Sequence, residues 1–370
     1  MSATFTPKPA RPAPASTTGL VGWLRQSLFS SIANTVLTIF CIGLIVWYVP
    51  GILDWLFFSA TWVGETAADC KYEGAGACWV YIGEWWNYFM YLRYPVEEQW
   101  RIDTMYIIAI LAGVPLLLPM VPRKIKMILG VFLLIPFPVI SFFMFVGGSF
   151  GLTYIETNLW GGMFLTLVIA ITGIVASLPL GILLALGRRS QMPAVRSVCV
   201  VFIEFWRGVP LITVLFMSSV MLPLFLPEGV NFDKLLRALI GVALFSSAYM
   251  AEVVRGGLQA IPKGQYEAAS ALGLNFWKSM GLIILPQALK IVIPGIVNTF
   301  IGLFKDTTLV LIIGLFDLLG AVQSSFSNPD WKDFPHEGYV FAAFAFWVFC
   351  FGMSRYSIAL ENKLHTGHKR

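Results

Sequence analysis

The sequence predicts an all-α membrane protein with about eight transmembrane helices. Of its 370 residues, 58% are hydrophobic and 12% are charged, and the mean hydropathy is +0.77. A soluble domain has about 45–50% apolar and about 25% charged residues, so this chain carries too few charges to cover a soluble surface. The same composition excludes disorder for most of the chain, because disorder requires low hydrophobicity and high charge.

Eight apolar runs approach the length of about 20 residues that a helix needs to cross the hydrocarbon core. They cover residues 30–49, 104–121, 127–146, 161–186, 197–225, 236–254, 287–304 and 339–360. The fifth run is too long for one straight span, and we expect it to break at Gly208-Val209-Pro210. Residues 122–126 are predicted to form a tight, charged turn. The stretch 307–316 is too short to span and is predicted to be a half-helix or a re-entrant piece.

These runs divide the chain into three predicted parts. Residues 1–28 are basic and rich in proline and alanine, which predicts a disordered cytoplasmic tail. Residues 29–150 form a three-span extension with a long periplasmic loop at 60–103, and residues 151–370 form a five-span domain. The first apolar run is not a cleaved signal peptide, because it is too long and lacks a small-x-small cleavage site.

The charged residues of the loops predict the orientation. The tail, the 122–126 turn, the 187–196 loop and the last ten residues are basic, whereas the 60–103 and 317–338 loops are acidic. The positive-inside rule therefore places both termini of this multi-pass membrane protein in the cytoplasm. Nucleic-acid binding is not supported, because the basic residues occur in short clusters between apolar runs.

The long outer loop holds two cysteines and many aromatic side chains. Cys70 and Cys78 are a candidate disulfide, because the outer side of a bacterial inner membrane is oxidising. We interpret the aromatic residues as a belt at the level of the lipid headgroups, in preference to a docking surface for an outer partner. These residues are Trp79, Tyr81, Trp85, Trp86, Tyr88, Tyr91, Tyr94 and Trp100.

The segment after the sixth run interrupts the membrane pattern and is expected in the cytoplasm. Pro262 suits the first turn of a helix, Gly273 permits a sharp stop and Asn275 can cap a second helix. We therefore expect two short helices within residues 262–280, along the inner membrane face. An interfacial helix is the alternative to a docking element. Small residues would allow close approach of another protein at Ala268, Ala269 and Gly273.

The same segment carries a spaced motif. Glu267, Ala268 and Ala269 are followed by Gly273 and then by Ile283, Leu285 and Pro286. This pattern resembles the EAA signature of bacterial ABC-importer permeases. Three more stretches are similar to polar amino-acid permeases, and they are Glu204-Phe205-Trp206-Arg207-Gly208-Val209-Pro210-Leu211, Ala248 through Gly257, and Leu303 through Leu309. The resemblance covers roughly residues 155–362.

The resemblance implies the membrane permease subunit of an ATP-driven importer of L-amino acids, of the histidine/glutamine-permease type. It implies a five-helix core and an EAA loop that couples to a cytoplasmic ATPase dimer through Glu267, Ala268, Ala269, Gly273 and Pro286. It also implies a related but distinct second permease and a periplasmic amino-acid-binding protein. The chain itself is then neither an enzyme nor a carrier of a cofactor. It lacks a Gly-Lys dipeptide, and therefore any phosphate-binding loop of the ATPase type.

Charged and polar residues within apolar runs are the candidate transport residues. Lys305 and Asp306 can line the amino-acid path, or they can form a self-satisfied pair or a turn at the outer interface. Thr307, Asn298 and Tyr249 complete the candidate path, although polar groups within spans more often join helices. Two pairs spaced by three residues form a candidate gate or structural latch, and they are Glu204 with Arg207 and Glu252 with Arg255.

No metal site is predicted, because the three histidines are scattered over loops and the C-terminal tail. Two rival functions remain. A secondary transporter would explain charges within the membrane, but it leaves the EAA-like segment unexplained and predicts inverted repeats. A membrane scaffold without a transport role is the other rival, and it predicts that changing Glu267 or Gly273 leaves uptake intact.

Overall fold

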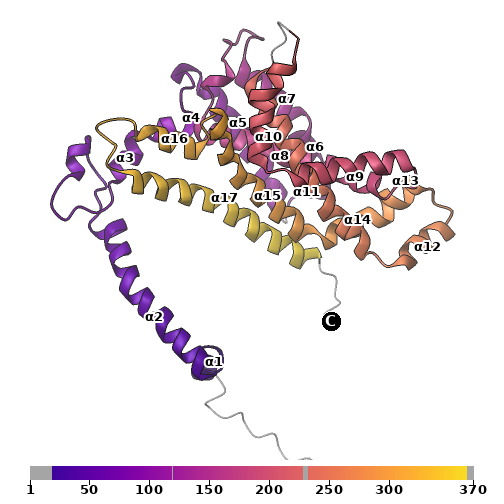
Figure 1. The fold of residues 1–370 in the computed structure, drawn as a ribbon, viewed down its shortest axis with the longest axis horizontal. Coiled ribbons are helices and arrows are strands. Elements are labelled where there is room, and N and C mark those ends of the chain that lie inside the picture. The colour runs from indigo at the N-terminus through magenta and orange to yellow at the C-terminus, as the bar shows by residue number, and fades with distance from the viewer. Residues whose placement is uncertain (1–18, 119, 228–231, 365–370) are drawn as a thin grey trace, which may run out of the picture. The chain divides into compact units, whose positions relative to one another are not determined.

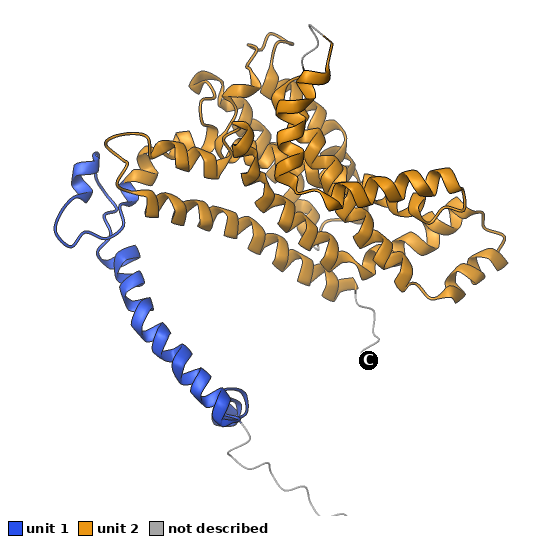
Figure 2. Cartoon of the chain, in the orientation of Figure 1, with its two compact units in different colours: residues 1–80 blue, residues 81–370 orange. Residues whose placement is uncertain are grey.

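The computed structural model describes residues 19–118, 120–227 and 232–364 (Figure 1). Every regular element within these ranges is a helix, which confirms the predicted all-α class. Pairing between extended residues is confined there to two isolated bridges, Thr61 with Cys78 and Gly162 with Asp317. The chain divides into two compact units, residues 1–80 and residues 81–370 (Figure 2).

The first unit is built around one long apolar helix. Its helices are α1 (Gly19–Ser27), α2 (Ile32–Leu53), the π-helical η2 (Asp54–Phe58) and the 3-10 helix η3 (Ala67–Cys70). Helix α1 departs from the predicted disordered tail, while residues 1–18 of that prediction lie outside the described residues. The Ser31 hydroxyl caps α2 by accepting from the Asn34 amide at 3.2 Å. Cys70 and Cys78 form a disulfide, with Cα atoms 5.6 Å apart.

The second unit contains the remaining helices. The first of them, α3, begins at Trp79, two residues before the start of the unit at Tyr81. The helices up to the middle of the chain are α3 (Trp79–Glu84), α4 (Trp86–Tyr91), η4 (Val96–Glu98), α5 (Trp100–Leu117), α6 (Arg123–Leu134), α7 (Pro136–Val146), η5 (Thr157–Leu159), α8 (Gly162–Arg188) and α9 (Pro193–Gly208). Those that follow are α10 (Leu211–Phe216), η6 (Met217–Met221), η7 (Leu222–Phe225), α11 (Lys234–Ala260), α12 (Lys263–Ala271), α13 (Phe276–Ser279), η8 (Met280–Ile284), α14 (Leu285–Ile291), α15 (Ile293–Asp306), η9 (Thr307–Ile313), α16 (Leu318–Ser325) and α17 (Pro335–Leu364).

Seven helical segments among the described residues are long and apolar enough to cross a membrane. They are Ile32–Phe58, Val96–Leu117, Arg123–Val146, Gly162–Arg188, Lys234–Ala260, Ile293–Ile313 and Pro335–Leu364. An eighth candidate is the pair Pro193–Gly208 and Leu211–Phe225, whose parts are bent by 101°. The predicted break in the fifth run is therefore confirmed. Pro210 lies at the bend, where its ring and missing N–H prevent α9 from continuing.

Two boundaries differ from the sequence prediction. The charged turn expected at 122–126 is shorter, because Arg123, Lys124 and Lys126 already belong to the first turn of α6. The Lys126 ammonium donates to the Leu116 carbonyl at 3.0 Å, which satisfies one of the C-terminal carbonyls of α5 that lack an intrahelical partner. The third span is also interrupted at Ile135, before the proline that opens α7.

The seventh span lies further along the chain than predicted. The expected span 287–304 is replaced by Ile293–Ile313, in which the 3-10 helix η9 continues α15. The stretch 307–316, expected to be a half-helix or re-entrant piece, is therefore mostly the end of this span. It stops at Gly314, whose φ of +71° suits glycine. Lys305 and Asp306 interrupt the hydropathy but not the backbone helix, which explains the displaced prediction.

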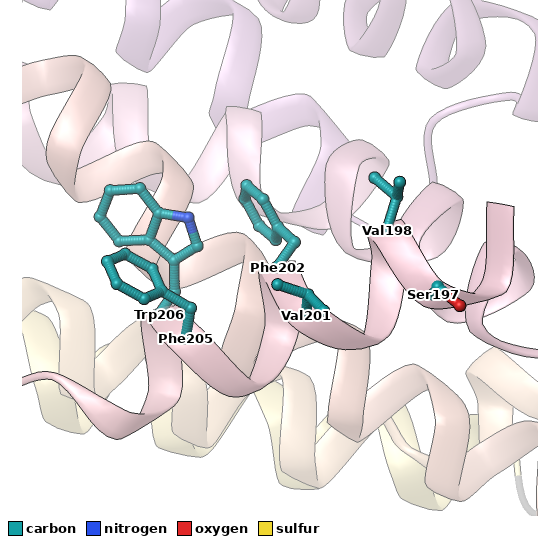
Figure 3. Close-up of a pocket in the computed structure, with 6 residues that line it drawn as sticks. All are labelled: Ser197, Val198, Val201, Phe202, Phe205 and Trp206. Carbon is teal, nitrogen blue, oxygen red and sulfur yellow. The ribbon is translucent and has the colours of Figure 1, made fainter. Parts of the chain in front are cut away.

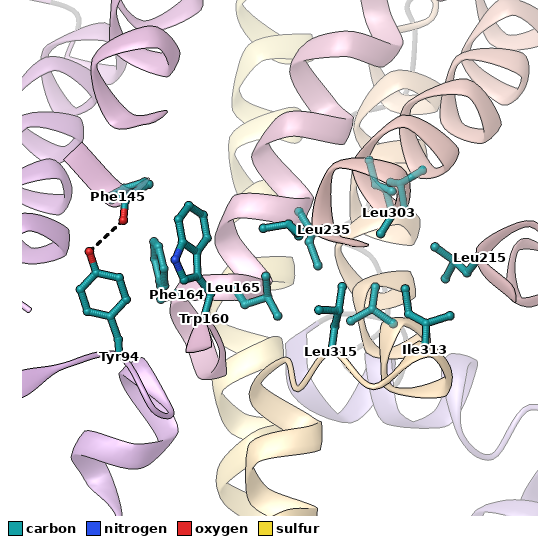
Figure 4. Close-up of a cluster of buried hydrophobic side chains, with 14 of the residues drawn as sticks. Tyr94, Phe145, Trp160, Phe164, Leu165, Leu215, Leu235, Leu303, Ile313 and Leu315 are labelled. Carbon is teal, nitrogen blue, oxygen red and sulfur yellow. Dashed lines mark hydrogen bonds between the residues drawn. The ribbon is translucent and has the colours of Figure 1, made fainter. Parts of the chain in front are cut away.

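One hydrophobic core joins residues on both sides of the predicted domain boundary at 150. Tyr94, Ile102 and Met105 belong to the same buried cluster as Phe164 and Leu165 of α8. The Tyr94 hydroxyl donates to the Phe145 carbonyl at 3.0 Å, beside Trp160 and Phe164 (Figure 4). The compact units are separated at residue 80 instead, so most of the predicted extension packs as part of the larger unit.

Two of the aromatic residues expected in the belt, Tyr81 and Tyr94, lie in the interior instead. Tyr81, Phe89 and Tyr94 are buried. The Tyr81 ring lies 5.7 Å from Trp331, and its hydroxyl shares a hydrogen bond with the Ser325 hydroxyl of α16. The belt interpretation is wrong for these two tyrosines, because Tyr81 packs against elements near the C-terminus and Tyr94 packs against Phe145 and Phe164. Large exposed aromatic side chains remain at Trp86 and Trp100.

Candidate functional site

The segment expected to dock on another protein forms two helices joined by a sharp turn. Pro262 is the N-cap of α12, one residue earlier than the predicted first turn. Gly273 has a φ of +68°, which a residue with a Cβ rarely adopts. The Asn275 side chain accepts from the Lys278 amide at 3.0 Å, so the predicted cap of α13 is confirmed. The second helix is not isolated, because η8 and α14 continue it directly.

The motif residues of this segment divide between the surface and the interior. Glu267, Ala268 and Gly273 are exposed, and a Cβ added at Gly273 would meet no atom within 4 Å. Ala269 is buried against its own chain, so the expectation that it contacts a partner is wrong. Pro286 is the second residue of α14, directly after the π-helical η8, so its missing N–H interrupts the backbone hydrogen bonds where the helix changes from π to α. Two large apolar residues extend the exposed surface, Leu272 and Trp277.

The two predicted charge pairs belong to a single network. Glu252 of α11 contacts Arg255 at 2.7 Å, which confirms that pair. Glu204 and Arg207 of α9 bond to other helices instead, so their predicted mutual pair is not formed. Arg207 contacts Glu252 at 3.5 Å, and Glu204 contacts Arg188 of α8 at 2.9 Å. Arg188 also reaches Glu252, at 2.8 Å.

Arg188 is the member that sequence reasoning missed. It counted only toward the positive charge of the 187–196 loop, yet it bridges the acids of α9 and α11. The available signal was its position at the end of a span, because a basic residue at a helix C-terminus has an anionic environment. Its acidic partners lie 16 and 64 residues away, so no spacing rule could find them.

The network ties the adjoining ends of three helices together. It joins three guanidinium groups to two carboxylates and so carries one excess positive charge. Glu252 is the best shielded carboxylate, with a side chain 14% exposed, whereas Glu204 is 54% exposed. The Arg207 guanidinium also lies 5.7 Å from the ring centre of Tyr249, within cation–π range. This arrangement can act as a latch that opens when one helix moves.

The candidate path residues are only partly available to a substrate. Lys305 and Asn298 are exposed and seven residues apart, so they lie on one face of α15. Asp306 is half-buried and forms no ion pair with Lys305, so the expected self-satisfied pair is absent from the described residues. Thr307 is buried and its hydroxyl donates to the Phe304 carbonyl, which removes it from the path.

A shallow hollow on α9 offers no alternative substrate site. All six of its residues come from this one helix, and they are Ser197, Val198, Val201, Phe202, Phe205 and Trp206 (Figure 3). The surface is almost entirely apolar and holds no charged group. A zwitterionic amino acid would lose its hydration there without gaining a partner for either charge. The face instead suits a hydrocarbon or protein environment.

Within the described ranges, no group of three histidine, cysteine, aspartate or glutamate side chains is placed to hold a metal ion. Two of the three histidines, His365 and His368, lie outside those ranges.

Comparison with known proteins places this geometry in a family. Residues 177–365 match the family described as "Binding-protein-dependent transport system inner membrane component". The inner membrane amino-acid ABC transporter permease protein YhdY of Escherichia coli (strain K12) is 56% identical, with 97% of each chain covered. The glutamate/glutamine/aspartate/asparagine transport system permease protein BztC of Rhodobacter capsulatus is 42% identical, again with 97% of each chain covered.

Among solved structures, one described as an amino acid ABC transporter with histidines is 30% identical. The match covers 55% of the present chain and 92% of the chain in the solved structure, with a TM-score of 0.49. The family assignment follows from the sequence matches, which include both the EAA-like segment and the ion network. The chain belongs to the inner-membrane components of binding-protein-dependent transport systems, and it is a multi-pass transport subunit that is not itself an enzyme.

Proposed function

We propose that this chain is the permease subunit of an ATP-driven importer that carries L-amino acids across the bacterial inner membrane. The observation that carries the proposal is the 56% identity over 97% of both chains to a protein named as an amino-acid ABC transporter permease. The exposed helix–turn–helix at α12 and α13 supports coupling to a separate subunit, because its motif residues Glu267 and Gly273 are free at the surface.

A separate pair of ATPase subunits docks on α12 and α13 and hydrolyses the ATP, so this chain binds no cofactor of its own. A related but distinct permease completes the membrane path, and a periplasmic amino-acid-binding protein delivers the substrate. The lipid bilayer covers the apolar surface, which includes a helix α2 with no buried residue. Nucleic acid has no part in this function.

Both termini face the cytoplasm in this proposal. The support is the alternation of basic and acidic loops, because basic loops stay on the cytoplasmic side. The disulfide between Cys70 and Cys78 agrees with an outer, oxidising position for the loop at 60–103. α12 and α13 then lie on the cytoplasmic side, where an ATPase can reach them.

The substrate passes the exposed face of α15 that carries Asn298 and Lys305. The Lys305 ammonium can pair with the substrate carboxylate, while the half-buried Asp306 stands beside it as a candidate partner for the substrate ammonium. The ion network around Glu252, together with Tyr249, acts as the gate or latch on the cytoplasmic side.

The test is purification from native membranes followed by reconstitution. We expect an ATPase subunit to co-purify, and we expect proteoliposomes that hold the complex to take up labelled L-amino acids only with ATP and a binding protein. Uptake driven by an ion gradient without ATP would replace the proposal with secondary transport. If the protein purifies without any ATPase and the proteoliposomes show no uptake, the function is that of a membrane scaffold without a transport role. A panel of the proteinogenic L-amino acids identifies the substrate.

A further inference from the structure

The end of α8 carries two consecutive arginines that hold different parts of the molecule. Arg189 reaches the proposed coupling helix, because its guanidinium donates to the Tyr266 hydroxyl of α12 at 2.9 Å. The same guanidinium lies 5.4 Å from the centre of the Tyr266 ring. It also donates to the Leu258 carbonyl of α11 at 3.2 Å, to which Tyr266 donates at 3.0 Å. Arg189, Tyr266 and Leu258 therefore form a closed triangle of hydrogen bonds.

Arg188 holds the ion network instead. Its guanidinium contacts Glu204 of α9 at 2.9 Å and Glu252 of α11 at 2.8 Å. Adjacent Cα atoms are about 3.8 Å apart, so the backbone positions of the two arginines move together. The last turn of α8 thus contacts α12 through one side chain and α9 through the next.

We propose that the Arg188-Arg189 pair is the mechanical relay that transmits displacement of α12 to the ion network on α9 and α11. This inference rests on the proposed function, in which a partner ATPase moves α12. Arg188 and Arg189 are positioning residues in this role, and neither needs to touch the transported amino acid.

The short range of these contacts gives the relay its sensitivity. A hydrogen bond is formed over about 2.7–3.2 Å and weakens steeply outside that range. A shift of α12 by about 1.5 Å, the rise of one helical residue, therefore breaks the Tyr266 contacts unless the end of α8 follows. When α8 follows, Arg188 moves with it relative to α9.

The burial of the two carboxylates decides which contact opens first. Glu252 has a side chain 14% exposed and contacts three guanidinium groups, so it holds its position on α11. Glu204 is 54% exposed, and Arg188 is its one ion-pair partner within the described chain. Solvent-exposed ion pairs are weak, so the Arg188–Glu204 contact yields and α9 is released from α8.

The test uses the intact complex in proteoliposomes, with its ATPase, second permease and binding protein. Four variants separate the contacts, and they are Arg189→Gln, Arg189→Lys, Tyr266→Phe and Arg188→Gln. ATP hydrolysis and uptake of a labelled L-amino acid are measured together, and their ratio is the readout. Arg196→Gln is the matched control, because Arg196 is exposed on α9 and its side chain forms no hydrogen bond or ion pair within the described residues.

We expect Arg189→Gln and Tyr266→Phe to raise the ATP hydrolysed per amino acid imported by about fivefold or more, the lower range of coupling between distant sites. Arg189→Lys keeps the charge and one donor, so it should restore part of the coupling. The relay also predicts that Arg188→Gln and Tyr266→Phe are not additive in this ratio, although no hydrogen bond joins their side chains. Arg196→Gln should leave the ratio unchanged.

Three results would overturn the relay. In the first, the variants lose uptake and hydrolysis in parallel, so that the ratio stays at the wild-type value and the arginines are merely structural. In the second, Arg188→Gln and Tyr266→Phe act independently. In the third, Arg196→Gln uncouples as strongly as Arg189→Gln. Failure of the wild-type complex to show ATP-dependent uptake would instead contradict the proposed function, so the two failures are distinguishable.

Discussion

At the scale of single residues, Glu252 is the centre of the ion network. Its carboxylate contacts Arg188, Arg255 and Arg207 at 2.8, 2.7 and 3.5 Å. Removing this charge leaves three guanidinium groups facing one another around a shielded position, which costs more than the loss of one contact.

We therefore expect Glu252→Gln to lower the free energy of unfolding by about 2–3 kcal/mol, slightly less than the cost of breaking a fully buried ion pair, because the Glu252 side chain is 14% exposed. The matched control is Glu204→Gln, for which we expect a loss of about 0.5 kcal/mol, because that carboxylate is 54% exposed. Thermal unfolding of the purified protein in detergent measures both. Equal losses for the two variants would contradict a network centred on Glu252.

Asp317 is a second informative residue, at the start of α16. One carboxylate oxygen accepts from the Gly320 amide at 2.9 Å, while the other is buried without a hydrogen-bond partner. Burial raises the pKa of Asp317 from its ordinary value of 3.8 to about 6. The folded protein therefore binds this proton more tightly than the unfolded chain does.

The sign of the pH effect follows from that difference. Between pH 3.8 and about pH 6 the folded state holds more protons, so the contribution of Asp317 to stability falls as the pH rises. We expect Asp317→Asn to keep the cap, to remove this slope and to raise the melting temperature at pH 7.5. Melting curves from pH 4 to pH 8 provide the measurement. A variant that melts lower than the wild type at pH 7.5 would show that the charge is stabilising.

At the scale of elements, the turn between α12 and α13 depends on one glycine. Gly273 has a φ of +68°, and the space around it is open. A bulky side chain at this position is disfavoured by the positive φ of the backbone. It would not collide with other atoms of this chain. Any crowding would come from a docked partner.

We expect Gly273→Trp to abolish uptake while membrane insertion and the amount of protein stay normal. Gly273→Asn is the control for the backbone, because asparagine tolerates a left-handed conformation better than other residues with a Cβ. It should retain much of the uptake. Transport assays in cells, with immunoblots of the membrane fraction, measure both properties. Normal uptake by the tryptophan variant would reject α12 and α13 as the coupling element.

At the scale of the whole molecule, the larger unit includes most of the predicted extension. Tyr94, Ile102 and Met105 share a buried cluster with Phe164 and Leu165, whereas residues 1–80 form a separate unit. Deletions that end at residue 80 and at residue 150 should therefore affect folding differently.

Deleting residues 1–80 should leave the larger unit folded, because its buried cluster stays complete. Deleting residues 1–150 removes several large buried side chains and should prevent folding, since each lost core residue costs about 2–5 kcal/mol. Size-exclusion profiles in detergent and thermal unfolding compare the two truncations. Equal behaviour of both would mean that the boundary at residue 80 has no energetic meaning.

Much of the fold and part of the site could be predicted from local sequence. The apolar runs, the break before Pro210, the stop at Gly273 and the Asn275 cap are local effects of hydropathy and backbone chemistry, and the structure contains them. The Glu252–Arg255 pair was also predictable, because residues three apart on a helix are neighbours. The displaced seventh span shows the limit of a prediction from hydropathy. Lys305 and Asp306 interrupt the apolar run, although the helix continues through them.

The sequence by itself determined that this chain is an all-helical membrane protein with a helix–turn–helix that resembles the EAA segment. Only the tertiary structure decided that Arg188 joins Glu204 to Glu252, that Arg189 holds Tyr266, and that Tyr81 and Tyr94 are buried. The physical reason is the range of the forces. Helix formation depends on neighbours within about four residues, whereas the contacts of the two arginines join residues 16 to 77 positions apart, which only packing brings together.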